Sequence, residues 1–329
     1  IMTNNPEIWL QAYANIYPNK GALTKGIDSS TLDGFSYERV ANITEQLKED
    51  RYRFTPSKRV YIPKSNRKLR PLGISSGNDK LVQEVTRMLL ESCYEPVFNH
   101  RSHGFRANRS CHTALDEIQR IWTGTKWWVE IDIEKYFDTI SHQKLLKLLE
   151  TKIDDRKFIR IIKMMFKAGY MEDWKFHQTY SGVPQGSGAS PILANIYLHE
   201  LDQFMEKLKG EFDLGKQRRT NPEYRTISLR IHRLRKQIDA LNINSEEAAK
   251  LKLRIQELDK RRKSISSGDP QDPTYKRINY VRYCDDILIG VIGSKKDASE
   301  IMAQVTAFLN KELALSISEE KSMIKYATE

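Results

Sequence analysis

The chain has 329 residues and a formal net charge of +11, with 39% hydrophobic and 9% aromatic residues. A chain of this length and hydrophobic content can bury the cores of about two domains, which excludes a disordered protein. The excess of Lys and Arg predicts attraction to a polyanion such as a nucleic acid, and a merely soluble basic surface is the alternative.

Cysteine usage and hydropathy exclude several other classes. The three cysteines, Cys93, Cys111 and Cys284, occur without a CxxC pair or a companion His at ligand spacing, so neither a disulfide framework nor a zinc site is expected. No apolar run approaches the roughly 18 residues that cross a bilayer, and the N-terminus has no signal-peptide pattern. We therefore expect a cytoplasmic protein with no membrane partner. Ile1 before Met2 indicates a piece excised from a longer protein.

The N-terminal part of the chain alternates helical and extended patterns. Apolar residues at helical spacing predict a helical region from 1 to about 54, interrupted by turns. Two extended stretches, 58–63 and 67–74, are joined by a polar turn and predict a basic hairpin. An amphipathic helix is predicted over 78–94.

The middle of the chain begins with an apolar, β-branched and aromatic run at 127–133, which predicts a core strand that contains Asp132. A helix is predicted from about 142 to 165. After a turn-rich segment, Ser190 is predicted to cap a helix that extends to about Met205.

Residues 206–263 differ in composition from the rest of the chain. They contain seventeen Lys or Arg and nine Asp or Glu residues, a net charge of +8. Two apolar stripes at helical spacing predict antiparallel helices, with Ser245 as the N-cap of the second. Such a hairpin is more often a structural insertion than an active site. Its basic outer faces favour an RNA contact, with Lys216, Arg218 and Arg219 as candidates.

The C-terminal part contains an acidic turn between apolar runs. Residues 278–291 have Asp285 and Asp286 at their centre, a pattern typical of a β-hairpin with acids at its turn. A helix over about 295–313 and a short strand at 315–317 are predicted to follow.

The acid pair is the strongest candidate for chemistry. An Asp-Asp turn often only accepts backbone hydrogen bonds. Here the apolar flanks predict a turn at the edge of a buried sheet, where adjacent carboxylates repel each other and a divalent cation relieves the repulsion. If the strand of Asp132 lies alongside, three carboxylates supply the oxygen ligands that suit Mg²⁺. Two such ions can activate a 3′-hydroxyl and stabilise a pyrophosphate leaving group.

A nucleoside triphosphate would also need cationic and amide donors. Lys64 and Arg70 on the basic hairpin could contact it, and a merely exposed basic loop explains that hairpin equally well. Gln185, between Pro184 and Gly186, could bring an amide close to the nucleotide, although a Gly/Pro turn is the commoner meaning of such a segment.

Taken in chain order, these motifs resemble those of the reverse transcriptases encoded by bacterial group II introns. The similar blocks, in order, are 62–73 (IPKSNRKLRPLG), 103–106 (HGFR), 130–138 (EIDIEKYFD), 182–186 (GVPQG), 190–198 (SPILANIYL) and 280–286 (YVRYCDD). Residues 315–322 (LSISEEKS) resemble the block that follows. Any one block is a weak signal, whereas six in order are specific.

The resemblance implies an α+β fold, namely the fingers and palm of a right-hand polymerase, in which an antiparallel palm sheet packs on helices. The implied divisions are an N-terminal helical extension (1–55), fingers (56–126), a first palm part with some fingers elements (127–205), a basic helical insertion (206–277) and a second palm part (278–329). The family continues from there into a thumb. With the thumb absent, we expect weak or distributive synthesis from this chain.

The resemblance also implies a catalytic metal site. Asp132 and Asp285 would bind two Mg²⁺ ions, aided by the backbone carbonyl of Ile133, and Asp286 would support them. These three aspartates are the implied catalytic residues.

Further implied contacts involve the nucleotide and the nucleic acid. Phe137 would lie under the sugar and exclude a 2′-hydroxyl, so that dNTPs are preferred and replacement by Ala or Val admits ribonucleotides; a core aromatic is the alternative. Arg106 would contact nucleic acid. Two departures from the family are Cys284, where Ala is usual, and Ser187, where a second Gly is common.

The implied activity is RNA-directed DNA polymerisation in the bacterial cytoplasm. The implied partners are dNTPs, an RNA template with a DNA primer, and group II intron RNA, which family members bind as maturases in splicing and retrohoming; the oligomeric state is open. Three alternatives remain. Phe137 argues against an RNA-dependent RNA polymerase, and the three acids argue against a non-catalytic RNA-binding splicing cofactor. Other bacterial reverse transcriptases, such as retron-type enzymes, share the same blocks.

Overall fold

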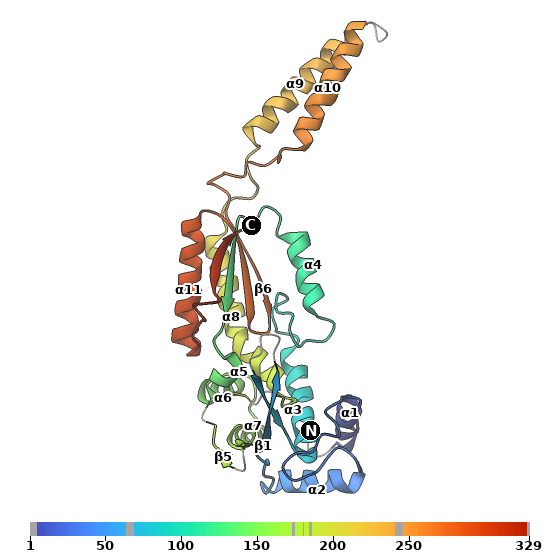
Figure 1. The fold of residues 1–329 in the computed structure, drawn as a ribbon, viewed down its shortest axis with the longest axis vertical. Helices are drawn as coiled ribbons and strands as arrows, with labels where there is room; N and C mark the ends of the chain where they lie inside the picture. The colour runs from blue at the N-terminus through green and yellow to red at the C-terminus, as the bar shows by residue number, and fades with distance from the viewer. Residues whose placement is uncertain are drawn as a thin grey trace.

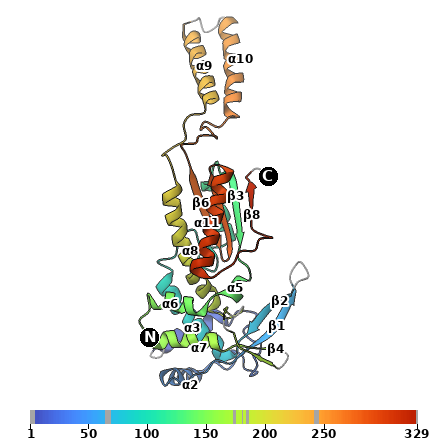
Figure 2. The same cartoon turned by 90° about the vertical axis from the view of Figure 1, so that its left-hand side faces the viewer.

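The computed structural model describes residues 5–63, 69–172, 175–179, 181–183, 186–240 and 246–327. In this part of the chain, two four-stranded sheets follow each other along the long axis of the molecule (Figure 1). A helical hairpin projects beyond the second sheet, at the end opposite the N-terminal helices (Figure 2). No helix in these ranges is both long and apolar enough to span a bilayer.

Two short helices open the chain, α1 (Pro6–Ile16) and α2 (Tyr37–Lys48). An Asn and a Ser side chain cap them by accepting a backbone N–H of the first turn. Their apolar faces share a core with α3 (Gly77–Tyr94), the amphipathic helix predicted over almost the same residues. The predicted helical N-terminus is thus confirmed for two helices, while residues 17–36 between them form turns and irregular structure.

The first sheet has the strand order β2-β1-β4-β5. Its strands are β1 (Ser57–Pro63), β2 (Leu69–Ile74), β4 (Tyr170–Glu172) and β5 (Lys175–His177). Strand β1 pairs antiparallel with β2, which confirms the predicted basic hairpin, and parallel with β4. The turn of that hairpin, residues 64–68, lies outside the described residues.

Five helices lie between the strands in the described middle of the chain. They are α4 (Cys111–Ile121), α5 (Tyr136–Thr139), α6 (His142–Glu150), α7 (Arg156–Lys167) and α8 (Ser190–Phe212). The single helix predicted over 142–165 is therefore wrong. The Asp155 carboxylate accepts from the backbone N–H groups of Lys157 and Phe158, at 2.9 and 3.1 Å, and so starts α7 as a separate helix.

Helix α8 differs from its prediction at both ends. Ser190 is its first residue rather than its cap, and the N-cap residue Ala189 has no side chain that can accept a hydrogen bond. The helix continues past Met205 to Phe212 because its inner face is still buried there, as at Leu208.

The second sheet is antiparallel throughout, with the order β6-β7-β3-β8. Its strands are β3 (Trp127–Asp132), β6 (Arg277–Tyr283), β7 (Asp286–Ile292) and β8 (Met323–Tyr326). Side chains alternate between two faces. Val129 and Ile131 face the main core, which α8 and α11 (Lys295–Leu313) cover, whereas Trp128 packs toward α4 on the other face (Figure 1).

The C-terminal expectations are confirmed for the acid hairpin and for α11, but not for a strand at 315–317. There a single antiparallel bridge joins Ile133 to Ile317, and the extended pairing begins later, in β8.

The basic insertion forms two antiparallel helices as predicted, α9 (Pro222–Asp239) and α10 (Glu246–Lys263). It leaves the body after α8, later than the predicted start at 206. Isolated bridges between Leu214 and Lys276 and between Thr220 and Gly268 close its base. The predicted cap Ser245 lies outside the described residues.

Candidate active site

Strand register brings the three predicted aspartates to one end of the second sheet. Asp132, the last residue of β3, is the Cα partner of Asp286, the first residue of β7. Tyr283 also pairs with Asp286, so Cys284 and Asp285 form a two-residue turn between β6 and β7. Cys284 has φ +58°, a left-handed conformation that tight hairpin turns require and that Gly usually supplies.

The carboxylates in this turn carry negative charge that their surroundings only partly balance. Burial raises the pKa of Asp285, and the charge of Asp132 raises it further. Burial also raises the pKa of Asp286, together with the charges of Asp285 and Asp132, although part of Asp286 reaches solvent. Lys321 donates to both oxygens of the Asp132 carboxylate at 3.0 Å. The site therefore attracts cations.

The donor set suits a hard divalent cation, because it consists of carboxylate oxygens on neighbouring strands with raised pKa values. As the side chains stand, no group of three His, Cys, Asp or Glu residues within the described ranges is arranged to hold an ion. The Lys321 contact accounts for this at Asp132. Carboxylate oxygens are nevertheless the ligands that hard divalent cations prefer, so the residue types at this end of the sheet fit such an ion.

The segment after α11 closes onto the end of β3. The backbone N–H of Ser318 donates to the Asp132 carbonyl at 2.8 Å, and the Asp132 N–H donates to the Ser322 hydroxyl at 3.2 Å. Ile133, predicted to offer its carbonyl to a metal, is buried and bridges to Ile317. These contacts fix the backbone of Asp132, and they also bring Lys321 to its carboxylate.

Phe137 lies half-buried on the short helix α5, five residues beyond Asp132. Its ring packs against the main core and meets the Tyr136 ring edge-on, with centroids 5.4 Å apart. Its carbonyl accepts from the N–H of Val183 at 2.7 Å. Gly182 has φ +88°, and a Cβ there would lie 2.9 Å from the Phe137 carbonyl oxygen, so only Gly permits this approach.

Only some of the predicted nucleotide contacts lie within the described residues. Arg70 is exposed on β2, and its positive charge lowers the pKa of Asp285, which opposes the increase caused by burial. Lys64 and Gln185 lie outside the described residues.

Arg106, predicted to bind nucleic acid, is instead a structural residue, and that expectation needs correction. Its side chain is buried and donates to the Glu95 carboxylate and to the carbonyls of Asn99 and Ser102 at 2.6 to 3.1 Å. A guanidinium with these partners folds its own loop, so it is not available to a phosphate.

The three basic residues at the insertion's base have different environments. Lys216 is exposed. Arg218 donates to the Gly124 carbonyl at 2.8 Å, and Arg219 pairs with Asp269 at 2.7 Å. Arg218 therefore ties the base of the insertion to the body, Arg219 pairs within that base, and Lys216 and Arg219 both remain exposed.

Two residues were missed by sequence reasoning, Lys321 and Arg282. Arg282 follows Ile278 and Tyr280 at two-residue intervals on β6, so strand alternation places it on the buried face with them. A charged residue at such a position needs a buried partner, which was the signal available in the sequence.

The chain is also similar in sequence to known proteins. Residues 62–216 match the family described as reverse transcriptase (RNA-dependent DNA polymerase). The group II intron-encoded protein LtrA of Lactococcus lactis subsp. cremoris is 47% identical over 325 residues, which cover 98% of this chain and 53% of that protein. An uncharacterized 91 kDa protein in a cob intron of Schizosaccharomyces pombe is 40% identical, covering 97% of this chain and 38% of that protein. The putative COX1/OXI3 intron 1 protein of Saccharomyces cerevisiae is 36% identical, covering 99% and 37%. The chain thus spans about half the length of LtrA, and less of the other two.

Proposed function

Since this chain belongs to the reverse transcriptases encoded by group II introns, we propose that it catalyses RNA-directed DNA synthesis. It transfers dNTPs to the 3′-hydroxyl of a DNA primer paired with an RNA template. The observation that carries the proposal is the pairing of Asp132 with Asp286, which sets three carboxylates at the end of two neighbouring strands.

The acids act as the cation-binding part of the site. Asp132 and Asp285, with the Ile133 carbonyl, are the proposed ligands of two Mg²⁺ ions, and Asp286 adds negative charge beside them. When bound, the two ions activate the primer hydroxyl and stabilise the pyrophosphate leaving group. The raised pKa values of Asp285 and Asp286 support this role, because burial and the neighbouring carboxylate charges both disfavour the ionised forms and a nearby cation would favour them.

Other residues orient the nucleotide. Arg70 and Lys64 are the proposed contacts of the triphosphate, and the effect of Arg70 on Asp285 supports its nearness to the reacting groups. Gln185 is the proposed amide contact. Phe137, held by the core and by the loop at 181–183, is the proposed barrier to a 2′-hydroxyl.

Group II intron RNA is the proposed second partner, bound in a maturase role. The support is the charge of the helical hairpin α9–α10, whose exposed residues include Arg230, Arg233 and Lys236 on α9 and Lys252 and Arg254 on α10. An Arabidopsis thaliana relative named nuclear intron maturase 4 is 28% identical over 244 residues. We place this activity in the bacterial cytoplasm, without a membrane partner.

Primer extension tests the catalytic proposal. We expect the chain to add dNTPs to a DNA primer on an RNA template, with Mg²⁺ required and EDTA inhibitory. The double variant Asp285→Asn/Asp286→Asn, which keeps side-chain size, is expected to lose at least ~10²-fold in rate, since the cation-binding charge is removed.

Asp116→Asn is the matched control, because Asp116 is a half-exposed carboxylate on α4 whose partner is Arg120. It should extend primers at the wild-type rate. A folded wild-type chain that adds no nucleotide at any Mg²⁺ concentration would overturn the proposal.

A further inference from the structure

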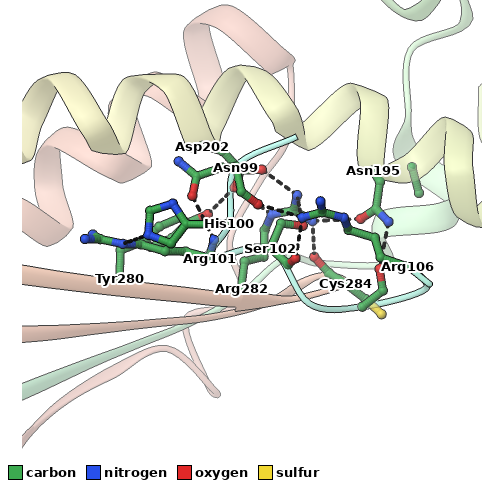
Figure 3. Close-up of polar contacts among 12 residues, drawn as sticks. Asn99, His100, Arg101, Ser102, Arg106, Asn195, Asp202, Tyr280, Arg282 and Cys284 are labelled. Carbon is green, nitrogen blue, oxygen red and sulfur yellow. Dashed lines mark hydrogen bonds and ion pairs between the residues drawn. The ribbon is translucent and has the colours of Figure 1, made fainter. Parts of the chain in front are cut away.

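A buried arginine contacts the two-residue turn, Cys284 and Asp285, that joins β6 to β7; this turn is called the acid turn below. Arg282 is on β6, two residues before Cys284, and both it and Asp202 on α8 are 0% exposed. Its Nε donates to Asp202 Oδ1 at 2.8 Å, and its Nη2 donates to Asp202 Oδ2 at 2.6 Å (Figure 3). This bidentate pair fixes the plane of the guanidinium.

The remaining donors of Arg282 reach the turn and its surroundings. Nη1 donates to the Cys284 carbonyl at 2.9 Å and to Asn195 Oδ1 at 3.0 Å, and Nη2 also donates to the Ser102 hydroxyl at 2.8 Å. Every N–H of the guanidinium therefore has an acceptor. One of these acceptors is the carbonyl of the left-handed residue that precedes Asp285.

The same network packs a loop against the turn. Asn195 donates to the Gly104 carbonyl at 2.7 Å, and a Cβ on Gly104 would lie 2.4 Å from both the nitrogen and the sulfur of Cys284. Backbone bonds join His103 N–H to the Arg282 carbonyl and Arg282 N–H to the Arg101 carbonyl, at 2.8 and 2.9 Å. The loop and the guanidinium thus pack against the turn, while Asp286 remains exposed and Asp285 is half-buried.

Stability of the sheet alone does not account for this arrangement, because a buried ion pair seldom stabilises a protein more than apolar side chains of the same volume. The guanidinium instead fixes the orientation of the turn, because its planar group of rigid donors hydrogen-bonds at once to a carbonyl of the turn, to a helix and to a loop. Groups that orient metal ligands from behind commonly change metal affinity or activity by about 10- to 100-fold when they are replaced.

We propose that Arg282 is a positioning residue for the metal site. Anchored by Asp202, it holds the Cys284 carbonyl and thereby sets the direction in which Asp285 and Asp286 leave the turn. This inference rests on the proposed polymerase function, and it assigns to Arg282 no contact with the metal, the nucleotide or the primer.

The test compares Arg282→Lys with Tyr280→Phe. Lysine keeps the charge for Asp202 but cannot also reach Cys284. Tyr280→Phe removes only the hydroxyl that donates to the same Asp202 carboxylate at 2.7 Å, so it disturbs the network without touching the turn. The readouts are Mn²⁺ affinity without substrates, followed by electron paramagnetic resonance, the Mg²⁺ concentration that gives half-maximal extension, and the thermal midpoint.

We expect Arg282→Lys to weaken Mn²⁺ binding and to raise the half-maximal Mg²⁺ concentration by about 10-fold or more. Tyr280→Phe should lower only the thermal midpoint. If Arg282→Lys does not fold, Asp202→Glu replaces it, because that change keeps the ion pair but lengthens the anchoring side chain by one methylene and so shifts the guanidinium away from the Cys284 carbonyl; a raised Mg²⁺ requirement then supports the proposal.

Unchanged metal dependence in folded Arg282→Lys, or in Asp202→Glu when it is used, overturns the positioning role even if the thermal midpoint falls. That result differs from failure of the proposed function, in which the wild-type chain itself extends no primer. One experiment distinguishes failure of the positioning role from failure of the proposed function, because the wild type is assayed at every Mg²⁺ concentration.

Discussion

The Asp132 carboxylate already has a cation beside it, because Lys321 donates to both of its oxygens. The Lys321 side chain is 66% exposed, and exposed ion pairs of this kind are worth about 0.2–1 kcal/mol. A metal ion bound by Asp132 would have to displace this ammonium group. At the scale of single residues, we therefore expect Lys321 to compete with metal ions for the proposed site.

Replacing Lys321 by Met should raise the affinity of the substrate-free chain for Mn²⁺ by up to about fivefold, which corresponds to the free energy of such an ion pair. A titration followed by electron paramagnetic resonance measures this directly. Lys325→Met is the control, since Lys325 pairs at 3.5 Å with Glu130, which is not among the proposed ligands. Equal affinity in wild type and Lys321→Met would show that the lysine does not compete.

Cys284 is placed where a thiol could affect the metal site, but its environment keeps it unreactive. Burial raises the pKa of its thiol to about 12, and the neighbouring Asp285 charge adds to the increase. The thiol is therefore protonated at neutral pH, and thiolate is the reactive form. The departure from the family's usual Ala thus leaves a small, inert side chain in the turn.

At the scale of elements, α6 supports the loop at 181–183 through one histidine. His142 Nε2 lies 2.6 Å from the Gly182 carbonyl, which requires the tautomer that carries its proton on Nε2. Its ring stacks on Phe166 with centroids 4.5 Å apart. Burial lowers its pKa below the ordinary 6.5, so the folded chain holds a neutral imidazole.

This arrangement predicts a loss of stability on acidification. Below pH 6.5 the unfolded chain binds a proton at His142 while the folded chain still resists it, so the free energy of unfolding decreases as the pH falls toward the lowered folded pKa. His142→Gln keeps a donor for Gly182 but does not titrate. Urea unfolding between pH 7.5 and 5.5 should therefore show a smaller decrease for this variant than for the wild type. The exposed His112→Gln should retain the wild-type decrease, and identical curves for all three chains would exclude the effect.

At the scale of the whole molecule, the basic hairpin is separate from the sheets that carry the acids (Figure 2). Its two ends meet where Thr220 bridges to Gly268 and the Asn221 N–H donates to the Ser267 carbonyl at 2.9 Å. Arg219 pairs with Asp269 within this base, and Arg218 ties it to the body through the Gly124 carbonyl. A short linker can therefore replace the hairpin without moving the body.

Replacing 222–266 by a short Gly/Ser linker should leave the thermal midpoint of the body and the rate of primer extension close to wild type. Affinity for group II intron RNA should fall, and the slope of log affinity against log salt should become shallower, by about 0.7–0.9 for each phosphate contact removed. Filter binding at several salt concentrations measures both. As a matched control, Glu246→Gln/Glu247→Gln changes the charge of the same hairpin while all of its Lys and Arg residues remain, and it should not weaken binding. An unchanged salt slope in the deletion would exclude the hairpin as an RNA contact.

Much of the local structure was predictable from the sequence because it depends on neighbouring residues. The hairpin around Asp285 and Asp286, helix α11 and the two helices of the insertion follow from side-chain periodicity. The wrong prediction of one helix over 142–165 also has a local cause. The apolar pattern continues across residues 151–155, but the Asp155 side chain caps a new helix there.

The sequence by itself determined the family, the types of most elements and the acids proposed for catalysis, since these reside in short ordered blocks and local patterns. Only the tertiary structure decided that Asp132 is the partner of Asp286, that Lys321 reaches Asp132 across 189 residues, and that Arg106 is structural. Register between strands and contacts between distant segments depend on how whole faces pack, and that packing has no signature in any single stretch of the chain. For the same reason, the sequence shows that Arg282 is charged, but it does not show that Arg282 donates a hydrogen bond to the Cys284 carbonyl.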